Sequence, residues 1–167
     1  MSYATTYYRG SAFRRRIEAR WAVFFDQVGI RWDYHPQGFN LIGSEYYMPS
    51  FYLYFSGGVY AEAKLEDGDF SKSEELAKSR KIVLLAGLPR PAVYWLLAPT
   101  VGRKGELNSF SETPVCFDSK YLCGANKDEN RFHIAPDRID KDDFSEEFEI
   151  ARSYSFYLET RFFNEFE

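Results

Sequence analysis

Glu62 and Lys64 are the two residues of this chain whose types and spacing most clearly suggest chemistry. They lie in the short, otherwise apolar segment 59–64. In a β-strand, residues two apart point to the same face, so these two side chains are expected side by side. A carboxylate and an ammonium group at the end of a buried strand suit phosphodiester hydrolysis with a divalent cation. The carboxylate would hold the metal, and the lysine would orient or deprotonate the attacking water.

The elements that must position this pair are predicted from hydrophobic periodicity. Apolar residues recur at three- and four-residue steps over 12–28, which predicts a helix, and Gly29 follows as its C-terminal cap. Alternating apolar residues with intervening glycine turns then predict an antiparallel meander. Its strands are expected at 30–34, 39–42, 46–55 and 59–65.

A second helix and a further strand are expected after the meander. The helix is predicted to start at Ser71 or Ser73 and to run to about residue 85, before Gly87. The continuous apolar run 92–97 is typical of a central strand that is covered on both faces.

The remaining third of the chain gives weaker patterns. Residues 102–114 are predicted as a polar loop, followed by a small hairpin over 115–123 and a strand at 131–134. A terminal helix is expected from Asp142 or Ser145 to Phe166, because apolar residues keep a helical period there.

Composition bounds the class of protein. A chain of 167 residues suits one domain with a real core, and the aromatic content of 19% is high. Two cysteines are too few for a disulfide scaffold and match no common zinc pattern; reduced thiols are favoured over a hairpin disulfide. No signal peptide is visible and the apolar runs are too short for a span, so a cytoplasmic protein without a membrane partner is expected.

The charge is distributed unevenly along the chain. The net charge is −4, but residues 1–35 carry six arginines against three acidic residues. Residues 140–167 carry nine acidic residues against three basic ones. The chain therefore has a basic beginning and an acidic end rather than a uniform charge.

Four segments together resemble the PD-(D/E)XK nuclease superfamily, in particular the small nuclease-like proteins of phages and actinobacteria. They are residues 8–25, 29–36, 49–53 and 60–64. The resemblance covers roughly residues 8–99 and implies an α/β fold of the restriction-endonuclease type, with a mixed central sheet flanked by helices. The expected organisation is a flexible basic arm (1–11), the nuclease-like core (12–99) and a C-terminal extension of the same domain (100–167). That extension would end in the acidic amphipathic helix.

The resemblance also implies roles for particular residues. Glu18 is similar to the family's helical glutamate, which supports the metal, and Glu62 to the second metal ligand. Lys64 is similar to the catalytic lysine. Glu18 and Glu62 would therefore hold Mg²⁺ or Mn²⁺. Ser50, directly after Pro49, occupies the place of the family's essential aspartate.

The serine at position 50 leaves three interpretations open, because a neutral hydroxyl is a poor ligand for a hard cation. The site can be inactive. It can bind metal through Glu18, Glu62 and a water, with reduced activity. Alternatively, another carboxylate can take the missing place. The candidates for that carboxylate are Asp33, Glu45 and Glu66.

Arginines near the start of the chain suggest a nucleic-acid-binding ridge, with phosphate contacts from a flexible arm and from the first helix. These residues are Arg9, Arg14, Arg15, Arg16 and Arg20. Simpler explanations stand beside each assignment. The arginines can form a solvated helix face, Glu62 and Lys64 an ordinary ion pair, and Glu18 a helix-surface pair with Arg14.

Two functions are consistent with these patterns. The first is a nuclease-fold protein with a degenerate metal site: a weak Mg²⁺-dependent DNA hydrolase or a nucleic-acid-binding relic, with DNA as the partner. The second is a catalytically inactive, phage-type protein that binds and inhibits a host defence complex, by analogy only. Ser50 favours loss of catalysis, whereas the intact Glu62 and Lys64 favour a working site.

Overall fold

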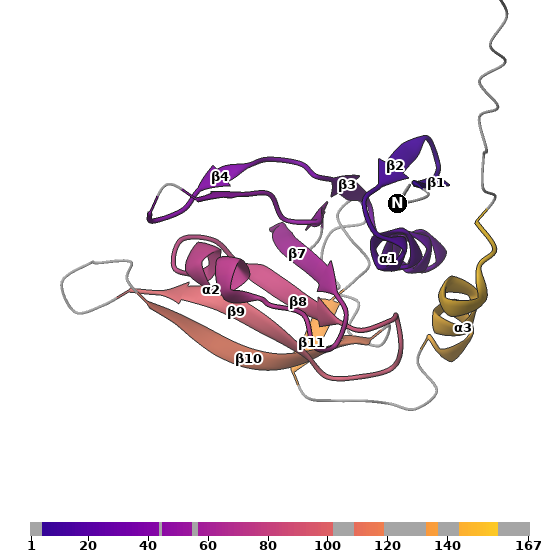
Figure 1. The fold of residues 1–167 in the computed structure, drawn as a ribbon. Helices are drawn as coiled ribbons and strands as arrows, with labels where there is room; N and C mark the ends of the chain where they lie inside the picture. Colours follow the sequence, from indigo (N-terminus) through magenta and orange to yellow (C-terminus); the bar gives the residue numbers. More distant parts are fainter. Residues whose placement is uncertain are drawn as a thin grey trace, which may run out of the picture.

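A computed structural model describes residues 5–43, 45–54, 57–101, 109–118, 133–136 and 144–156. Within these ranges the helices are α1 (Arg16–Val28), α2 (Ser71–Ala77) and α3 (Ser145–Ser153). The strands are β1 (Thr6–Tyr8), β2 (Ser11–Phe13), β3 (Trp32–Tyr34), β4 (Phe39–Asn40), β5 (Tyr46–Tyr47), β6 (Phe51–Leu53), β7 (Val59–Lys64), β8 (Ile82–Ala86), β9 (Tyr94–Thr100), β10 (Ser109–Asp118) and β11 (His133–Pro136). The predicted α/β class with a mixed sheet is confirmed (Figure 1).

The main sheet has seven strands in the order β11-β10-β9-β8-β7-β6-β3. β7 and β8 run parallel, and the other neighbouring strands of this sheet run antiparallel. The parallel pair is joined by the segment that contains α2, as expected because parallel neighbours need a long crossover connection. The pairs β1–β2 and β4–β5 form separate two-stranded sheets.

Helices cover both faces of this sheet, and β8 shows how. Its residues Val83 and Leu85 are buried in the same cluster as α1, whereas Ile82 belongs to the cluster that contains Leu76 of α2. Because adjacent strand residues point to opposite faces, α1 and α2 lie on opposite sides of the sheet. Figure 1 shows the two helices in this arrangement.

The larger core is built around α1 and its aromatic residues. Trp21, Phe24 and Phe25 are fully buried. Phe24 stacks on Phe148 of α3 with ring centroids 4.2 Å apart and planes at 10°, so α3 packs against α1. As predicted, α1 ends at Gly29, whose φ of 77° is the left-handed conformation that glycine adopts readily.

The beginning of the chain differs from the prediction. Residues 6–13 form the β1–β2 hairpin, so a flexible arm is wrong for residues 6–11, and α1 starts at Arg16 rather than at residue 12. The hairpin is held because Tyr8 donates a 2.8 Å hydrogen bond to Asp26 of α1. Tyr8 also packs edge-on against Tyr154.

The helix predicted to reach residue 85 is also wrong in its second half. α2 ends at Ala77, and residues 82–86 form β8. An apolar run such as Ile82–Leu85 fits either a buried helix or a buried strand, and periodicity alone does not separate them. Here β8 lies between β7 and β9, where the run is covered on both faces.

The C-terminal part extends the same sheet. The polar loop predicted over 102–114 is wrong for residues 109–114, which belong to β10; 102–108 lie outside the described residues. β10 pairs with β9 along Ser109–Val115, and β11 adds one more strand. The predicted terminal helix is observed as α3, and residues 154–156 are not helical. Residues 119–132 and 157–167, on which parts of these predictions fall, lie outside the described residues. No helix of the described ranges is long and apolar enough to cross a membrane.

Candidate functional site

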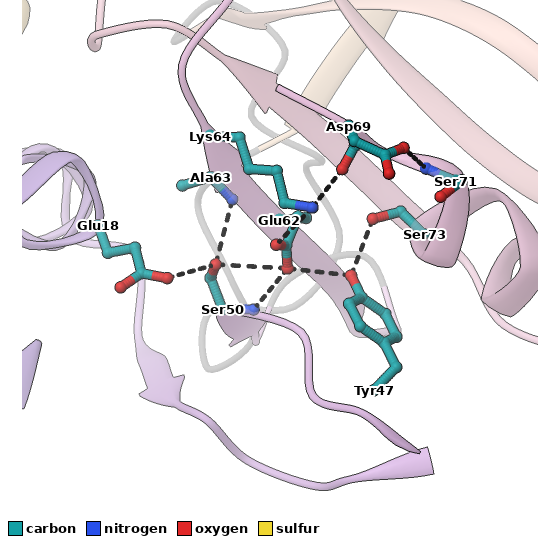
Figure 2. A network of polar contacts seen from close by, with 9 residues as sticks. All are labelled: Glu18, Tyr47, Ser50, Glu62, Ala63, Lys64, Asp69, Ser71 and Ser73. Carbon is teal, nitrogen blue, oxygen red and sulfur yellow. Dashed lines mark hydrogen bonds and ion pairs between the residues drawn. The ribbon is translucent and has the colours of Figure 1, made fainter. Parts of the chain in front are cut away.

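Glu18, Ser50, Glu62 and Lys64 meet at one end of the sheet (Figure 2). Glu18 comes from the first turn of α1, Ser50 from the bend just before β6, and Glu62 and Lys64 from β7. The side chains of Ala61 and Ala63 are buried on the α1 side of β7, so Glu62 and Lys64 share the opposite side, as the strand periodicity predicts. The four residues singled out from the sequence therefore lie together in the folded chain.

Ser50 lies at the centre of the group and is 1% exposed. Its hydroxyl oxygen is 3.0 Å from Oε1 of Glu18 and 3.4 Å from Oε2 of Glu62. A hydroxyl has one proton to donate, and the shorter contact assigns it to Glu18. The backbone N–H of Ala63 donates to the same oxygen at 3.2 Å. One serine thus links α1 with β7.

Glu62 is surrounded by donors. Its Oε2 accepts the backbone N–H of Ser50 at 3.1 Å and the hydroxyl of Tyr47 at 2.9 Å. Tyr47 in turn shares a 2.8 Å hydrogen bond with the hydroxyl of Ser73, in α2. Burial and the adjacent charge of Glu62 raise the pKa of Tyr47, which keeps its hydroxyl protonated and able to donate.

Glu18 accepts three hydrogen bonds from the protein. Its Oε2 accepts the backbone N–H of Arg15 at 3.0 Å and the hydroxyl of Tyr34 at 2.8 Å. The contact with Arg15 is one half of a capping box, in which the side chain of the third helical residue accepts the backbone N–H of the N-cap residue. Burial raises the pKa of Glu18, although its hydrogen bonds from Tyr34 and Ser50 oppose that shift.

Lys64 is held at the edge of this network. Its ammonium nitrogen is 3.5 Å from Oε1 of Glu62 and donates to the backbone carbonyl of Asp69. The ring of Phe70 lies 5.5 Å from the same nitrogen. The expected ion pair between Glu62 and Lys64 is therefore present, but as one contact within a larger hydrogen-bonded network.

The residues present do not suit Mg²⁺ or Mn²⁺ in this arrangement. Mg²⁺ requires oxygen ligands at about 2.0–2.1 Å in octahedral geometry. Here the Ser50 hydroxyl lies between the two carboxylates, and protein donors face both oxygens of Glu18 and of Glu62. A cation could enter only by displacing these donors. Across the described residues no cluster of three or more potential metal ligands is found.

The three carboxylates considered as replacements for the missing aspartate have other contacts. Glu45 pairs with Lys72 at 3.4 Å, and Glu66 pairs with Arg90 at 2.7 Å. Asp33 accepts the hydroxyl of Tyr54. No contact joins any of the three to Ser50 within the part of the chain that the structure describes.

The five arginines of the expected ridge separate into two groups. Arg9 forms a 3.1 Å ion pair with Asp26, and Arg20 donates to carbonyls at the end of α3, including that of Ala151 at 3.0 Å. The guanidinium of Arg16 lies over the Phe156 ring at 5.8 Å. Arg14 and Arg15 are exposed, and neither forms an ion pair with any other described residue.

Tyr34, Tyr47 and Ser73 belong to the site but were not predicted from the sequence. Each supplies a hydroxyl to the network from an element other than β7: Tyr34 from β3, Tyr47 from β5 and Ser73 from α2. The signal available was weak: Tyr47 lies three residues before Ser50, and Tyr34 alternates with Trp32 in a predicted strand. Which hydroxyls reach the carboxylates depends on how β3 and β5 pack against α1 and β7.

Comparisons with protein-family models, with curated proteins and with solved structures gave no match to this chain.

Proposed function

We propose that this chain is a restriction-endonuclease-like protein whose metal site is closed by Ser50 and which binds nucleic acid without hydrolysing it. The observation that carries this proposal is the position of the Ser50 hydroxyl between Glu18 and Glu62. In a nuclease site of this type, the carboxylates must offer oxygens to a cation. Here those oxygens are used in hydrogen bonds to the protein.

The network explains why Glu62 and Lys64 would persist without catalysis. Glu62 is 4% exposed, and a buried carboxylate without partners is strongly destabilising. Tyr47, the Ser50 N–H and Lys64 together supply its donors. A structural role is therefore sufficient to retain both residues in a protein that no longer cleaves its ligand.

Two exposed arginines support nucleic acid as the ligand. Arg14 and Arg15 lie at the start of α1, next to the network, and without ion pairs to described carboxylates. Guanidinium groups in this state are free to contact phosphates, which supply much of the affinity for nucleic acid. Acidic residues slightly outnumber basic ones in the chain as a whole (25 against 21), so binding is expected to be local and moderate in strength.

The direct test combines a cleavage assay with a binding assay. Purified protein is incubated with linear, nicked and branched DNA in Mg²⁺ and in Mn²⁺, and binding to the same DNAs is measured by fluorescence anisotropy. We expect binding that weakens steeply with added salt, and no cleavage in either metal. Lys64→Ala serves as the control for cleavage, because activity that disappears in this variant would identify a working nuclease and refute the proposal.

A protein that is folded but binds no nucleic acid would also refute it. In that case, capture of protein partners becomes the next experiment, since inhibition of a host defence complex is the other function expected from the sequence.

A further inference from the structure

The turn after β3 places an aromatic pair directly beside the polar network. His35 has a φ of 48°, a left-handed conformation that is uncommon for a non-glycine residue. Its N–H donates to the carbonyl of Ser50 at 3.0 Å, which fixes the turn against the site. Its ring stacks on Tyr34 with centroids 3.8 Å apart and planes at 22°. A strained residue is thus held in one orientation at the edge of the site.

Tyr34 is itself fixed from two sides. Its hydroxyl donates to Glu18 at 2.8 Å and accepts the backbone N–H of Arg14 at 2.9 Å. Its ring also packs on Phe13 at a centroid distance of 4.3 Å. Tyr34 is therefore held in place beneath the imidazole of His35. Tyr34 covers one face of the imidazole, and His35 remains partly exposed to solvent.

Two arginines act electrostatically on the imidazole of this stack. Burial, together with the charges of Arg14 and Arg15, lowers the pKa of His35 to about 4. The imidazole is therefore neutral at pH 7, while the two guanidinium groups beside it stay charged. The result is an uncharged aromatic surface with cations next to it.

We propose that the Tyr34–His35 stack, with Arg14 and Arg15, binds single-stranded nucleic acid, one unpaired base stacking on His35 and phosphates contacting the arginines. This inference rests on the proposed function and specifies its ligand. Sites for single strands combine aromatic rings, on which bases stack, with cations that follow the backbone. Bases inside a duplex have both faces covered by their neighbours, so they cannot use the imidazole surface.

The test measures anisotropy of a labelled oligothymidine, alone and annealed to its complement, over a range of salt concentrations. The single strand should bind more tightly than the duplex. His35→Asn removes the ring and keeps a residue type that tolerates positive φ. This variant should weaken single-strand binding about tenfold, as expected for one lost base stack, and leave the salt dependence unchanged.

The arginine variants should change a different quantity. For single strands, each phosphate contact contributes about −0.7 to the slope of log affinity against log salt. Arg14→Gln and Arg15→Gln should therefore each reduce the magnitude of that slope by about 0.7. Arg80→Gln is the matched control, because Arg80 is exposed, donates to the neighbouring Ser79 carbonyl, and has no described contact with the stack or with Arg14 and Arg15. It should change neither the affinity nor the slope.

The outcomes separate this inference from the proposed function. Equal affinity for single strand and duplex, or a His35→Asn variant that binds like the parent, overturns the single-strand site but leaves a nucleic-acid-binding protein. Absence of binding to every nucleic acid overturns the proposed function itself. Thermal unfolding of each variant identifies a folding defect. If His35→Asn does not fold, the arginine slopes and the comparison of strand with duplex decide the question.

Discussion

Ser50→Ala is the substitution that most directly tests whether Ser50 joins the two buried carboxylates. It removes the hydroxyl that donates to Glu18 at 3.0 Å and accepts the N–H of Ala63 at 3.2 Å. Glu18 is 3% exposed, so water cannot replace the lost donor without entering the core. The buried N–H of Ala63 loses its acceptor at the same time.

The magnitude follows from these two losses. A hydrogen bond to a charged group contributes about 1.5–3 kcal/mol, and a buried unsatisfied N–H costs about 1–3 kcal/mol. Because the side chains can relax, we expect the free energy of unfolding to fall by about 3 kcal/mol. For a chain of this size that corresponds to a Tm lower by about 9 °C.

The assay is urea denaturation followed by near-ultraviolet circular dichroism, with thermal unfolding as a second measurement. Ser79→Ala is a matched control, because Ser79 is exposed and its hydroxyl donates to the Leu76 carbonyl at 3.2 Å. The control should change the free energy of unfolding by less than about 0.5 kcal/mol. A loss below about 1 kcal/mol in Ser50→Ala would show that the hydroxyl does not hold the network together, and the closed-site argument would fail.

Three further predictions concern the same network and the helix that supports it. Ser50→Asp should lower the free energy of unfolding in the absence of metal, because it places a third carboxylate beside Glu18 and Glu62. Saturating Mg²⁺ should restore about 2–3 kcal/mol. A calorimetric titration that shows no Mg²⁺ binding to this variant would contradict the prediction. Glu18 has a raised pKa in the folded state, so its contribution to stability is complete below the ordinary glutamate pKa and is lost as pH rises through the raised value. In urea titrations at several pH values, Glu18→Gln should reduce this loss of unfolding free energy with rising pH. A pH profile identical to that of the parent protein would refute the prediction. Arg20→Gln should destabilise the contact between α3 and α1 by about 2 kcal/mol, which hydrogen exchange would detect as faster exchange in α3. Nucleic-acid binding should be unchanged. A loss of affinity in this variant would place Arg20 in the binding surface.

Local patterns in the sequence determined the parts of this protein that depend on near neighbours. The helical period ending at Gly29 predicted α1, and the alternation around Glu62 predicted β7 and the shared side of Glu62 and Lys64. The α/β class followed from the order of these elements. Such features could be predicted because helix caps and strand faces are set by residues only a few positions apart.

The tertiary structure alone decided whether an apolar run is helix or strand where its two faces are both covered. Ile82–Leu85 fits both patterns, and its place between β7 and β9 makes it a strand. Thr6–Tyr8, expected within a flexible arm, is instead a strand because β2 and α1 pack against it. In both cases the free energy comes from pairing and packing with other elements, which periodicity does not register.

For the chemistry of the site, too, some features followed from the sequence and others only from the fold. Strand alternation paired Glu62 with Lys64, and the resemblance to the nuclease superfamily added Glu18 and Ser50 and marked the serine as the decisive position. Only the folded chain decided that the Ser50 hydroxyl lies between the two carboxylates, and that Tyr34 and Tyr47 complete their hydrogen bonds. The physical reason is that a buried carboxylate takes whichever donors packing brings within about 3 Å, and packing joins residues far apart in the chain.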